Sequence, residues 1–86
     1  MKIVFKKSFE KQYVKLTQWQ KENVNKSINI FMDNPKNPIL KNHSLKGRLK
    51  GKNSISVSHD MRIVFIEHDN YYLVEFLALW SHNQVY

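Results

Sequence analysis

A β-hairpin is predicted by Arg62-Ile63-Val64-Phe65-Ile66, the polar turn His68-Asp69-Asn70 and the apolar run Tyr71-Tyr72-Leu73-Val74-Glu75-Phe76-Leu77-Ala78-Leu79. Both apolar runs are rich in the β-branched and aromatic residues that favour strands. A short turn between two such runs is typical of antiparallel pairing. Ser58-His59-Asp60 reads as another turn on the N-terminal side, so this part of the chain is predicted to form an antiparallel β-meander.

The residues before this hairpin predict first a strand, then helices, and then further strands. Ile3, Val4 and Phe5 read as a short strand. Residues 8–34 have mostly helical spacing of apolar side chains and are predicted to form two helices joined near Thr17. Ser8 is expected to cap the first helix, Thr17 and Gln20 suggest a capping box for the second, and Asn34-Pro35 ends it.

Residues 35–44 are predicted to be a loop, and the apolar period then changes to two at Leu45, Leu49, Ile55 and Val57. Helices that precede a run of strands indicate an α+β fold. The expected architecture is an N-terminal strand, a two-helix hairpin and an antiparallel meander, with the helices packed on one sheet face. We expect residues 1–86 to form a single domain, because a chain of this length supports only one thin core.

Composition narrows the class of protein. The sequence has no cysteine, which excludes a disulfide framework and thiolate metal sites. No apolar stretch approaches the ~20 residues of a membrane helix, and the N-terminal apolar run is too short for a signal peptide, so a cytoplasmic location and no membrane partner are expected. Fourteen Lys and Arg against seven Asp and Glu give a net charge of +7. This field favours an anionic partner or, less specifically, solubility.

Polar groups that can carry chemistry occur in separate parts of the second half. His43 precedes a strongly basic stretch with Lys46, Arg48, Lys50 and Lys52, which is predicted to follow a phosphate backbone. Asp60 and Arg62 lie at a turn and at the start of a strand, and His82 and Tyr86 lie in the polar tail Ser81–Tyr86. Because strand ends of a meander meet at sheet edges, we expect His43, Asp60, Arg62, His82 and Tyr86 to share one basic cleft.

This set of side chains suits metal-independent RNA cleavage by internal transfer. Histidine exchanges protons near neutral pH and can act as acid or base toward the ribose 2′-OH and the leaving 5′ oxygen. The arginine fork can bind two phosphate oxygens and stabilise the phosphorane. No metal-binding spacing, glycine-rich nucleotide loop or serine-nucleophile motif is present, and no cofactor is expected.

Each candidate also has a structural interpretation. In this interpretation His43 makes only a turn hydrogen bond, and Asp60 only orders its hairpin turn by bonding to the backbone. Arg62 is then a surface residue or a partner of Asp60, and Tyr86 only packs its ring on the sheet. His59 and His68 lie in predicted turns and are expected to be solvated.

The order of three short motifs resembles toxins of the RelE/ParE superfamily, and the YafQ-like branch of mRNA interferases in particular. The resemblance covers nearly the whole chain and rests on His43-x-Leu45-x-Gly47-x-x-Lys50-Gly51, Asp60-Met61-Arg62-Ile63-Val64-Phe65 and Ser81-His82-Asn83-Gln84-Val85-Tyr86. It implies a RelE-like fold and a toxin of a type II toxin–antitoxin module. It also implies a ribosome-dependent mRNA endoribonuclease that contacts 16S rRNA and is neutralised by an acidic cognate antitoxin.

The resemblance further implies roles for individual residues. The positions of His43, Asp60, His82 and Tyr86 match active-site positions of YafQ-like toxins, and Arg62 matches a catalytic arginine of RelE-like members. The chain departs from the YafQ pattern with Ser56 in place of a histidine, Met61 in place of tryptophan, and Trp80 in place of glycine. Two other functions are compatible with the sequence: a ParE-like inhibitor of DNA gyrase, and a non-catalytic basic binding module.

Overall fold

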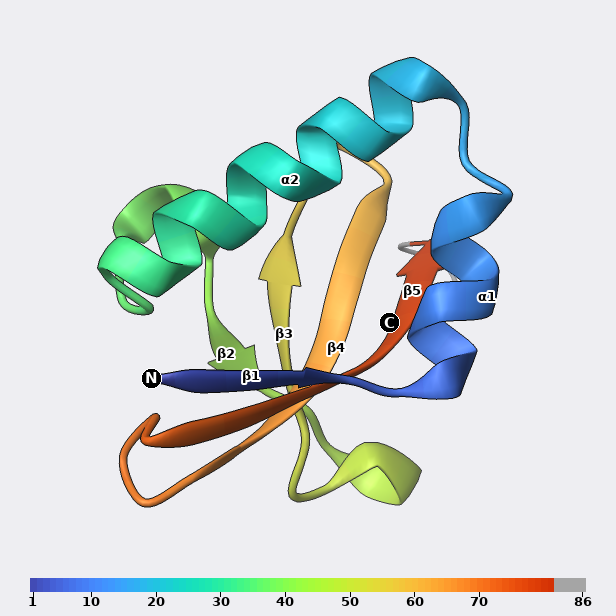
Figure 1. Cartoon of the computed structure of the whole chain (residues 1–86). Helices are drawn as coiled ribbons and strands as arrows, with labels where there is room; N and C mark the ends of the chain where they lie inside the picture. The colour runs from blue at the N-terminus through green and yellow to red at the C-terminus, as the bar shows by residue number, and fades with distance from the viewer. Residues whose placement is uncertain (82–86) are drawn as a thin grey trace.

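The computed structural model describes residues 1–81, which form a five-stranded mixed sheet with the strand order β1-β5-β4-β3-β2. The strands are β1 (Lys2–Phe5), β2 (His43–Ser44), β3 (Asn53–Ser56), β4 (Met61–His68) and β5 (Leu73–Ser81). Strands β2 to β5 pair antiparallel in chain order, and β3, β4 and β5 form the predicted meander. Strand β1 pairs parallel with β5, which makes β1 one edge of the sheet and β2 the other (Figure 1).

The two predicted helices are α1 (Lys7–Val14) and α2 (Gln18–Asp33). The predicted capping box is present: the Gln20 amide donates to the Thr17 hydroxyl at 3.2 Å, and the Thr17 amide donates to Gln20 Oε1 at 2.9 Å. Helix α2 ends at Asp33, because Asn34 before Pro35 is extended. The prediction for Ser8 was wrong. Helix α1 already begins at Lys7, and the Ser8 hydroxyl donates to the Leu77 carbonyl instead.

Both helices pack on the same face of the sheet and share one core. The Phe9 ring of α1 lies 5.8 Å from the Phe76 ring of β5, and the Phe31 ring of α2 lies 5.6 Å from that same ring. Phe31 also meets the Phe65 ring edge-on at 5.1 Å. The fully buried members of this core are Val24, Phe31, Leu40, Ile55, Ile63, Phe65, Val74 and Phe76. The predicted α+β architecture, with the helices on one sheet face, is confirmed.

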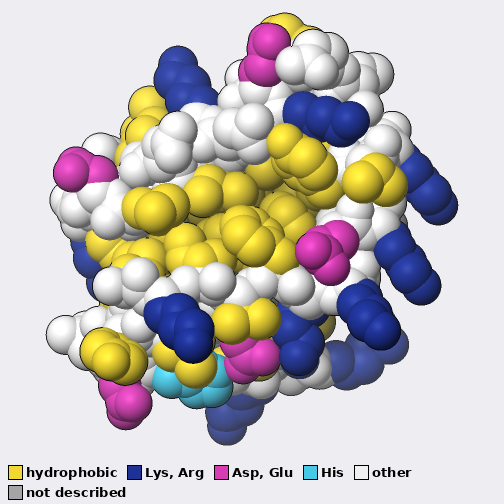
Figure 2. Space-filling model, in the orientation of Figure 1, with side chains coloured by type: hydrophobic (Ala, Val, Ile, Leu, Met, Phe, Trp, Pro, Cys, Tyr) yellow, Lys and Arg dark blue, Asp and Glu magenta, His cyan; other side chains and the backbone are white. Residues whose placement is uncertain are grey.

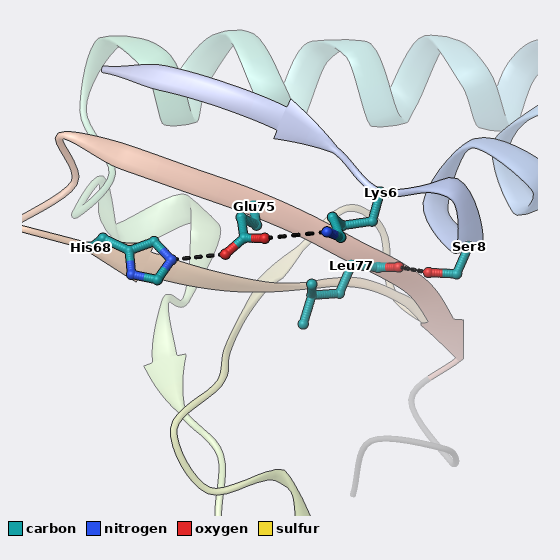
Figure 3. A network of polar contacts seen from close by, with 5 residues as sticks. All are labelled: Lys6, Ser8, His68, Glu75 and Leu77. Carbon is teal, nitrogen blue, oxygen red and sulfur yellow. Dashed lines mark hydrogen bonds and ion pairs between the residues drawn. The ribbon is translucent and has the colours of Figure 1, made fainter.

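Side chains of α1 close the part of the β5 edge that β1 leaves open. Strand β1 pairs only with residues 73–76 of β5. Beyond them, the Leu77 carbonyl accepts the Ser8 hydroxyl and the Leu79 amide donates to Gln12 Oε1 at 2.8 Å (Figure 3 shows the first of these bonds). A strand edge with unpaired polar groups is thereby satisfied by a helix.

The segments between these elements are more structured than the sequence indicates. The predicted loop 35–44 contains a 3₁₀ turn at Pro38–Leu40 and strand β2. Another 3₁₀ turn, Gly47–Leu49, lies between β2 and β3, where strand residues were expected. Residues Asp69, Asn70 and Tyr71 all have positive φ, so the β4–β5 turn is longer than predicted and β5 begins at Leu73.

Candidate functional site

The sheet face opposite the helices brings together residues from β2, β3 and β4. His43 pairs with Ser54, which pairs with Val64. Ser56 pairs with Arg62, and Arg62 pairs with Trp80. Arg62 lies two residues from Val64 on β4, so side-chain alternation places Arg62 and His43 on the same face. Standard strand spacings put their Cα atoms about 12 Å apart, roughly the reach of one or two nucleotides.

Arg62 is held by the residues of its own hairpin. Its Nη1 donates to the Ser56 hydroxyl at 2.6 Å and to the Ser58 carbonyl at 3.5 Å. The side chain is half-buried. The alternative that Arg62 forms an ion pair with Asp60 is not confirmed, because no ion pair joins these two residues in the part of the chain that the structure describes. The Ser56 hydroxyl and the Ser58 carbonyl are thus two neutral acceptors that orient the guanidinium.

His43 is oriented by a backbone carbonyl. Its Nδ1 lies 2.8 Å from the Lys41 carbonyl oxygen, which can only accept a hydrogen bond, so Nδ1 carries the proton. In the neutral ring Nε2 then has the lone pair, which is the form of a general base. Lys41 has a left-handed backbone (φ 50°), and this turn delivers the carbonyl to the ring.

Asp60 lies at the exposed tip of the β3–β4 hairpin, and the position is as predicted from the sequence. Its Oδ1 accepts the Ser58 hydroxyl at 3.2 Å. The hairpin is closed by the Val57 amide, which donates to the Met61 carbonyl at 2.9 Å. Asp60 thus orders the turn that carries Arg62, and it immediately precedes Met61, the first residue of β4.

The predicted basic track forms a closed loop at the other end of β3. The Leu45 amide donates to the Lys52 carbonyl at 2.9 Å, and Gly47 and Gly51 have φ of +67° and +91°. Lys46, Arg48 and Lys50 are exposed, and Lys52 is half-buried. This loop extends beyond the sheet end formed by Ser44 and Asn53, whereas Arg62 faces Ser56 (Figure 1). The cations are therefore neighbours of His43 and not of Arg62.

The tail begins later than the sequence suggests. Ser81 is the last residue of β5 and pairs with Met61, the neighbour of Arg62. His82 and Tyr86, which are predicted site residues, lie outside the described residues. Strand β5 therefore ends beside Met61, the residue that precedes Arg62 on β4.

A polar network on the same sheet face was missed from the sequence. His68 is the last residue of β4, and its Nε2 lies 2.8 Å from Glu75 Oε2, while Lys6 Nζ lies 3.5 Å from Glu75 Oε1 (Figure 3). The hydrogen bond from His68 lowers the pKa of Glu75 below its ordinary value, and the Lys6 charge acts in the same direction. The expectation that His68 is only solvated was wrong. Period-two alternation in both strands is the sequence signal that puts these side chains on one face.

An apolar groove lies between α1, α2 and β1, on the side of the molecule shown in Figure 2. Its volume is about 340 Å³. Phe5 and Val14 are 43% and 68% exposed. The groove, here called the α1–α2 groove, is lined by Phe5, Phe9, Glu10, Tyr13, Val14, Asn25 and Ile28. An exposed apolar surface of this kind marks an interaction site more often than an isolated exposed side chain does.

The described part of the chain contains no group of three or more His, Asp or Glu side chains arranged to hold a metal ion. Among residues 1–81, no helix has both the length and the apolar character needed to cross a bilayer.

The fold matches that of solved structures of YoeB/ParE and YafQ toxins. The structure of a YoeB/ParE toxin from Agrobacterium tumefaciens superposes with a TM-score of 0.78 at 22% identity, over 95% of this chain and 99% of the other. YafQ from E. coli superposes with a TM-score of 0.76 at 21% identity, over 98% of this chain and 96% of the other.

A third similar structure is that of the heterotetrameric YoeB–YefM toxin–antitoxin complex from Staphylococcus aureus, with a TM-score of 0.73 at 21% identity over 95% of this chain and 97% of the other. No protein-family profile matches the sequence, and no curated protein sequence matches it. The resemblance predicted from the three sequence motifs is therefore confirmed at the level of the fold.

Proposed function

We propose that the chain is the toxin of a type II toxin–antitoxin module and acts as a ribosome-dependent mRNA endoribonuclease. The observation that supports this most is the placement of His43 and Arg62 on one sheet face, with Arg62 next to the β4 residue that pairs with the last residue of β5. An oriented general base and an oriented cation are the parts that cleavage of a phosphodiester requires.

The proposed reaction uses the ribose 2′-OH as nucleophile. A base, His43 or Asp60, removes its proton as the O2′–P bond forms. Arg62 stabilises the negative charge of the phosphorane. His82 protonates the 5′ oxygen as the P–O5′ bond breaks, and Tyr86 stacks on or orients a base. The products are a 2′,3′-cyclic phosphate and a 5′-hydroxyl. Side chains supply the base, the acid and the cation, so the scheme includes no metal ion. The two histidines can also exchange roles, because an imidazole ring can act as acid or as base.

The substrate is mRNA on the ribosome, and contacts with 16S rRNA supply much of the binding. The exposed cations Lys46, Arg48 and Lys50, with Lys52, form the phosphate-binding loop beside His43. The basic loop lies beyond Asn53, which is itself about 10 Å from Ser56 along β3. We therefore propose that the ribosome holds the mRNA against both the loop and Arg62. We therefore expect little cleavage of naked RNA.

The experiment is to incubate the purified protein with translating ribosomes and map mRNA ends. Wild type should produce 5′-hydroxyl ends, and His82→Ala and Arg62→Ala should lower the rate at least 100-fold, because each removes a group that acts in the transition state. His59→Ala, an exposed residue at the hairpin tip, is the matched control. Intact mRNA with wild type, together with inhibited DNA gyrase, would show that the alternative ParE-like function is correct.

The partner is a cognate antitoxin that is acidic, as the net charge of +7 favours. Solved structures with this fold include the YoeB–YefM toxin–antitoxin complex. We place the apolar part of the antitoxin in the α1–α2 groove, where it would cover Phe5 and Val14 and leave its acidic residues facing the surrounding lysines. Loss of toxicity on co-expression, and its return with Val14→Glu, would support this placement.

A further inference from the structure

We propose that Ser56 and Ser27 are positioning residues that fix the Arg62 guanidinium, Ser56 by a direct hydrogen bond and Ser27 by holding the backbone of Ser56. This inference rests on the proposed function for its meaning in catalysis, but its structural part can be tested without any RNA. Neither residue is expected to touch the substrate.

Ser56 contacts Arg62 directly. The two residues face each other across β3 and β4, and the Ser56 hydroxyl accepts from Arg62 Nη1 at 2.6 Å. The Ser56 hydroxyl itself donates to the Ser58 carbonyl at 3.4 Å, and that carbonyl accepts a second, longer bond from Arg62 Nη1 at 3.5 Å. A hydroxyl can donate once and accept twice, so Ser56 is able to link the guanidinium to the hairpin turn.

Ser27 fixes the backbone of Ser56 from the other side of the sheet. Its hydroxyl donates to the Ser56 carbonyl at 3.2 Å, and the Ser27 side chain is almost fully buried, at 6% exposure. This carbonyl needs a partner outside the sheet for two reasons. The next ladder bond to β4 is made by Val57, so the backbone groups of Ser56 point away from β4. Strand β2 pairs only with Asn53 and Ser54, and it ends before it reaches Ser56.

The chain of contacts therefore runs from α2 to the guanidinium: Ser27 holds the end of β3, and Ser56 at that end holds Arg62. A small cavity of about 190 Å³ lies beside it, lined by residues that include Ser27, Ser56 and Val57. Arginine has many rotamers, and restricting them before the substrate binds reduces the entropy lost in reaching the transition state. A histidine at position 56 would offer its own acid or base, whereas serine offers orientation only.

Guanidinium NMR provides the test that does not depend on activity. Arg48 and Arg62 are the only arginines in the sequence, so their ¹⁵N guanidinium signals can be assigned with Arg48→Lys. Arg48 is exposed and provides an internal reference for a freely rotating group. In wild type, Arg62 should show resolved Nη signals from hindered rotation. In Ser56→Ala the barrier to rotation should fall and the Arg62 signals should broaden toward those of Arg48, while Ser56→Thr should restore them.

Kinetics on programmed ribosomes provides the second readout. Ser56→Ala should lower kcat about tenfold with little change in KM. The variant loses the hydrogen bond that holds the charged guanidinium in the orientation needed in the transition state. Ser27→Ala should lower kcat less, and Asn29→Ala, an exposed residue of the same helix, should not change it. Thermal unfolding of each variant separates this effect from loss of fold.

The two proposals fail in different ways. If wild type does not cleave mRNA but Arg62 loses its order in Ser56→Ala, the positioning is correct and the proposed function is wrong. If wild type cleaves, and Arg62 remains ordered and kcat unchanged in Ser56→Ala, the positioning inference is overturned and the proposed function is unaffected.

Discussion

Among residues 1–81, Glu75 is the residue whose ionisation is most altered by its neighbours. It lies near the start of β5 and is contacted by His68 of β4 from one side and by Lys6, just after β1, from the other. The His68 hydrogen bond is the largest cause of its lowered pKa, partial burial opposes it, and the Lys6 charge adds to the lowering. The carboxylate thereby connects three segments that are distant in the sequence.

The sign of the resulting pH dependence follows from this shift. Because the pKa of Glu75 is lower in the folded state, its contribution to stability is present above the ordinary value of 4.5 and is lost as the pH falls through the lowered value. His68→Gln should raise the pKa of Glu75 toward the ordinary value, and Lys6→Met should raise it less. A carboxyl-carbon NMR titration checks this, with His59→Gln as control. An unchanged Glu75 titration in His68→Gln would contradict the assigned cause.

The residues of the candidate site differ in how far the sequence reveals them. His43, Asp60 and Arg62 were found because polar groups next to apolar strands are conspicuous, and the structure puts His43 and Arg62 on one face. Ser56 was noticed only as a departure from a resemblance. Ser27 gave no signal, because a serine within a helix is unremarkable until a strand end lies beside it. Its role depends on a contact 29 residues away.

At the level of secondary-structure elements, the helices close both incomplete strand edges with polar side chains. Ser8 and Gln12 of α1 satisfy β5 beyond the end of β1, and Ser27 of α2 satisfies β3 beyond the end of β2. Each edge strand is short, so the neighbouring strand would otherwise present unpaired backbone groups that invite pairing with another chain. The helices thus contribute polar partners to the sheet as well as the aromatic core.

Removal of one such partner should destabilise the protein measurably. Gln12→Ala leaves the half-buried Leu79 amide without the acceptor at 2.8 Å. The expected loss is about 1–3 kcal/mol of unfolding free energy, the usual cost of an unsatisfied buried donor. Gln12→Glu keeps an acceptor and should cost less. Urea unfolding curves check both variants, with exposed Gln18→Ala on α2 as the control. Equal stability of Gln12→Ala and wild type would show that water replaces the bond.

Which elements could be predicted depends on whether their signal is local. The α2 boundaries were predicted because the capping box and Asn34-Pro35 lie within the segment itself. The order of β3, β4 and β5 followed from short turns. The parallel pairing of β1 with β5 was not predicted, because it joins Lys2 to Leu73 and no local pattern specifies a partner at that distance. Strand β2 was missed because two residues are too few to show a period.

On the scale of the whole molecule, charge and exposed apolar surface occur in different places. The basic loop Lys46–Lys52 projects from the end of the sheet, whereas the α1–α2 groove lies between the helices and β1 (Figures 1 and 2). Binding of a polyanion therefore depends mainly on charge interactions, which salt weakens by screening. The groove provides an apolar contact, which salt does not weaken. An mRNA and an antitoxin should respond differently to ionic strength for this reason.

The affinity of the proposed acidic antitoxin for this protein should accordingly have two contributions, one from charge and one from apolar contact. In a titration at increasing salt, wild-type affinity should fall and then level off, because screening removes the charge contribution and leaves the apolar one. Val14→Ser should raise Kd by about fivefold at every salt concentration, the effect of losing roughly 1 kcal/mol of apolar burial. Lys50→Gln should instead reduce the slope with salt if the basic loop takes part. A Val14→Ser effect that disappears at high salt would mean that the groove contact is not apolar, and an unchanged Kd would place the antitoxin elsewhere on the surface.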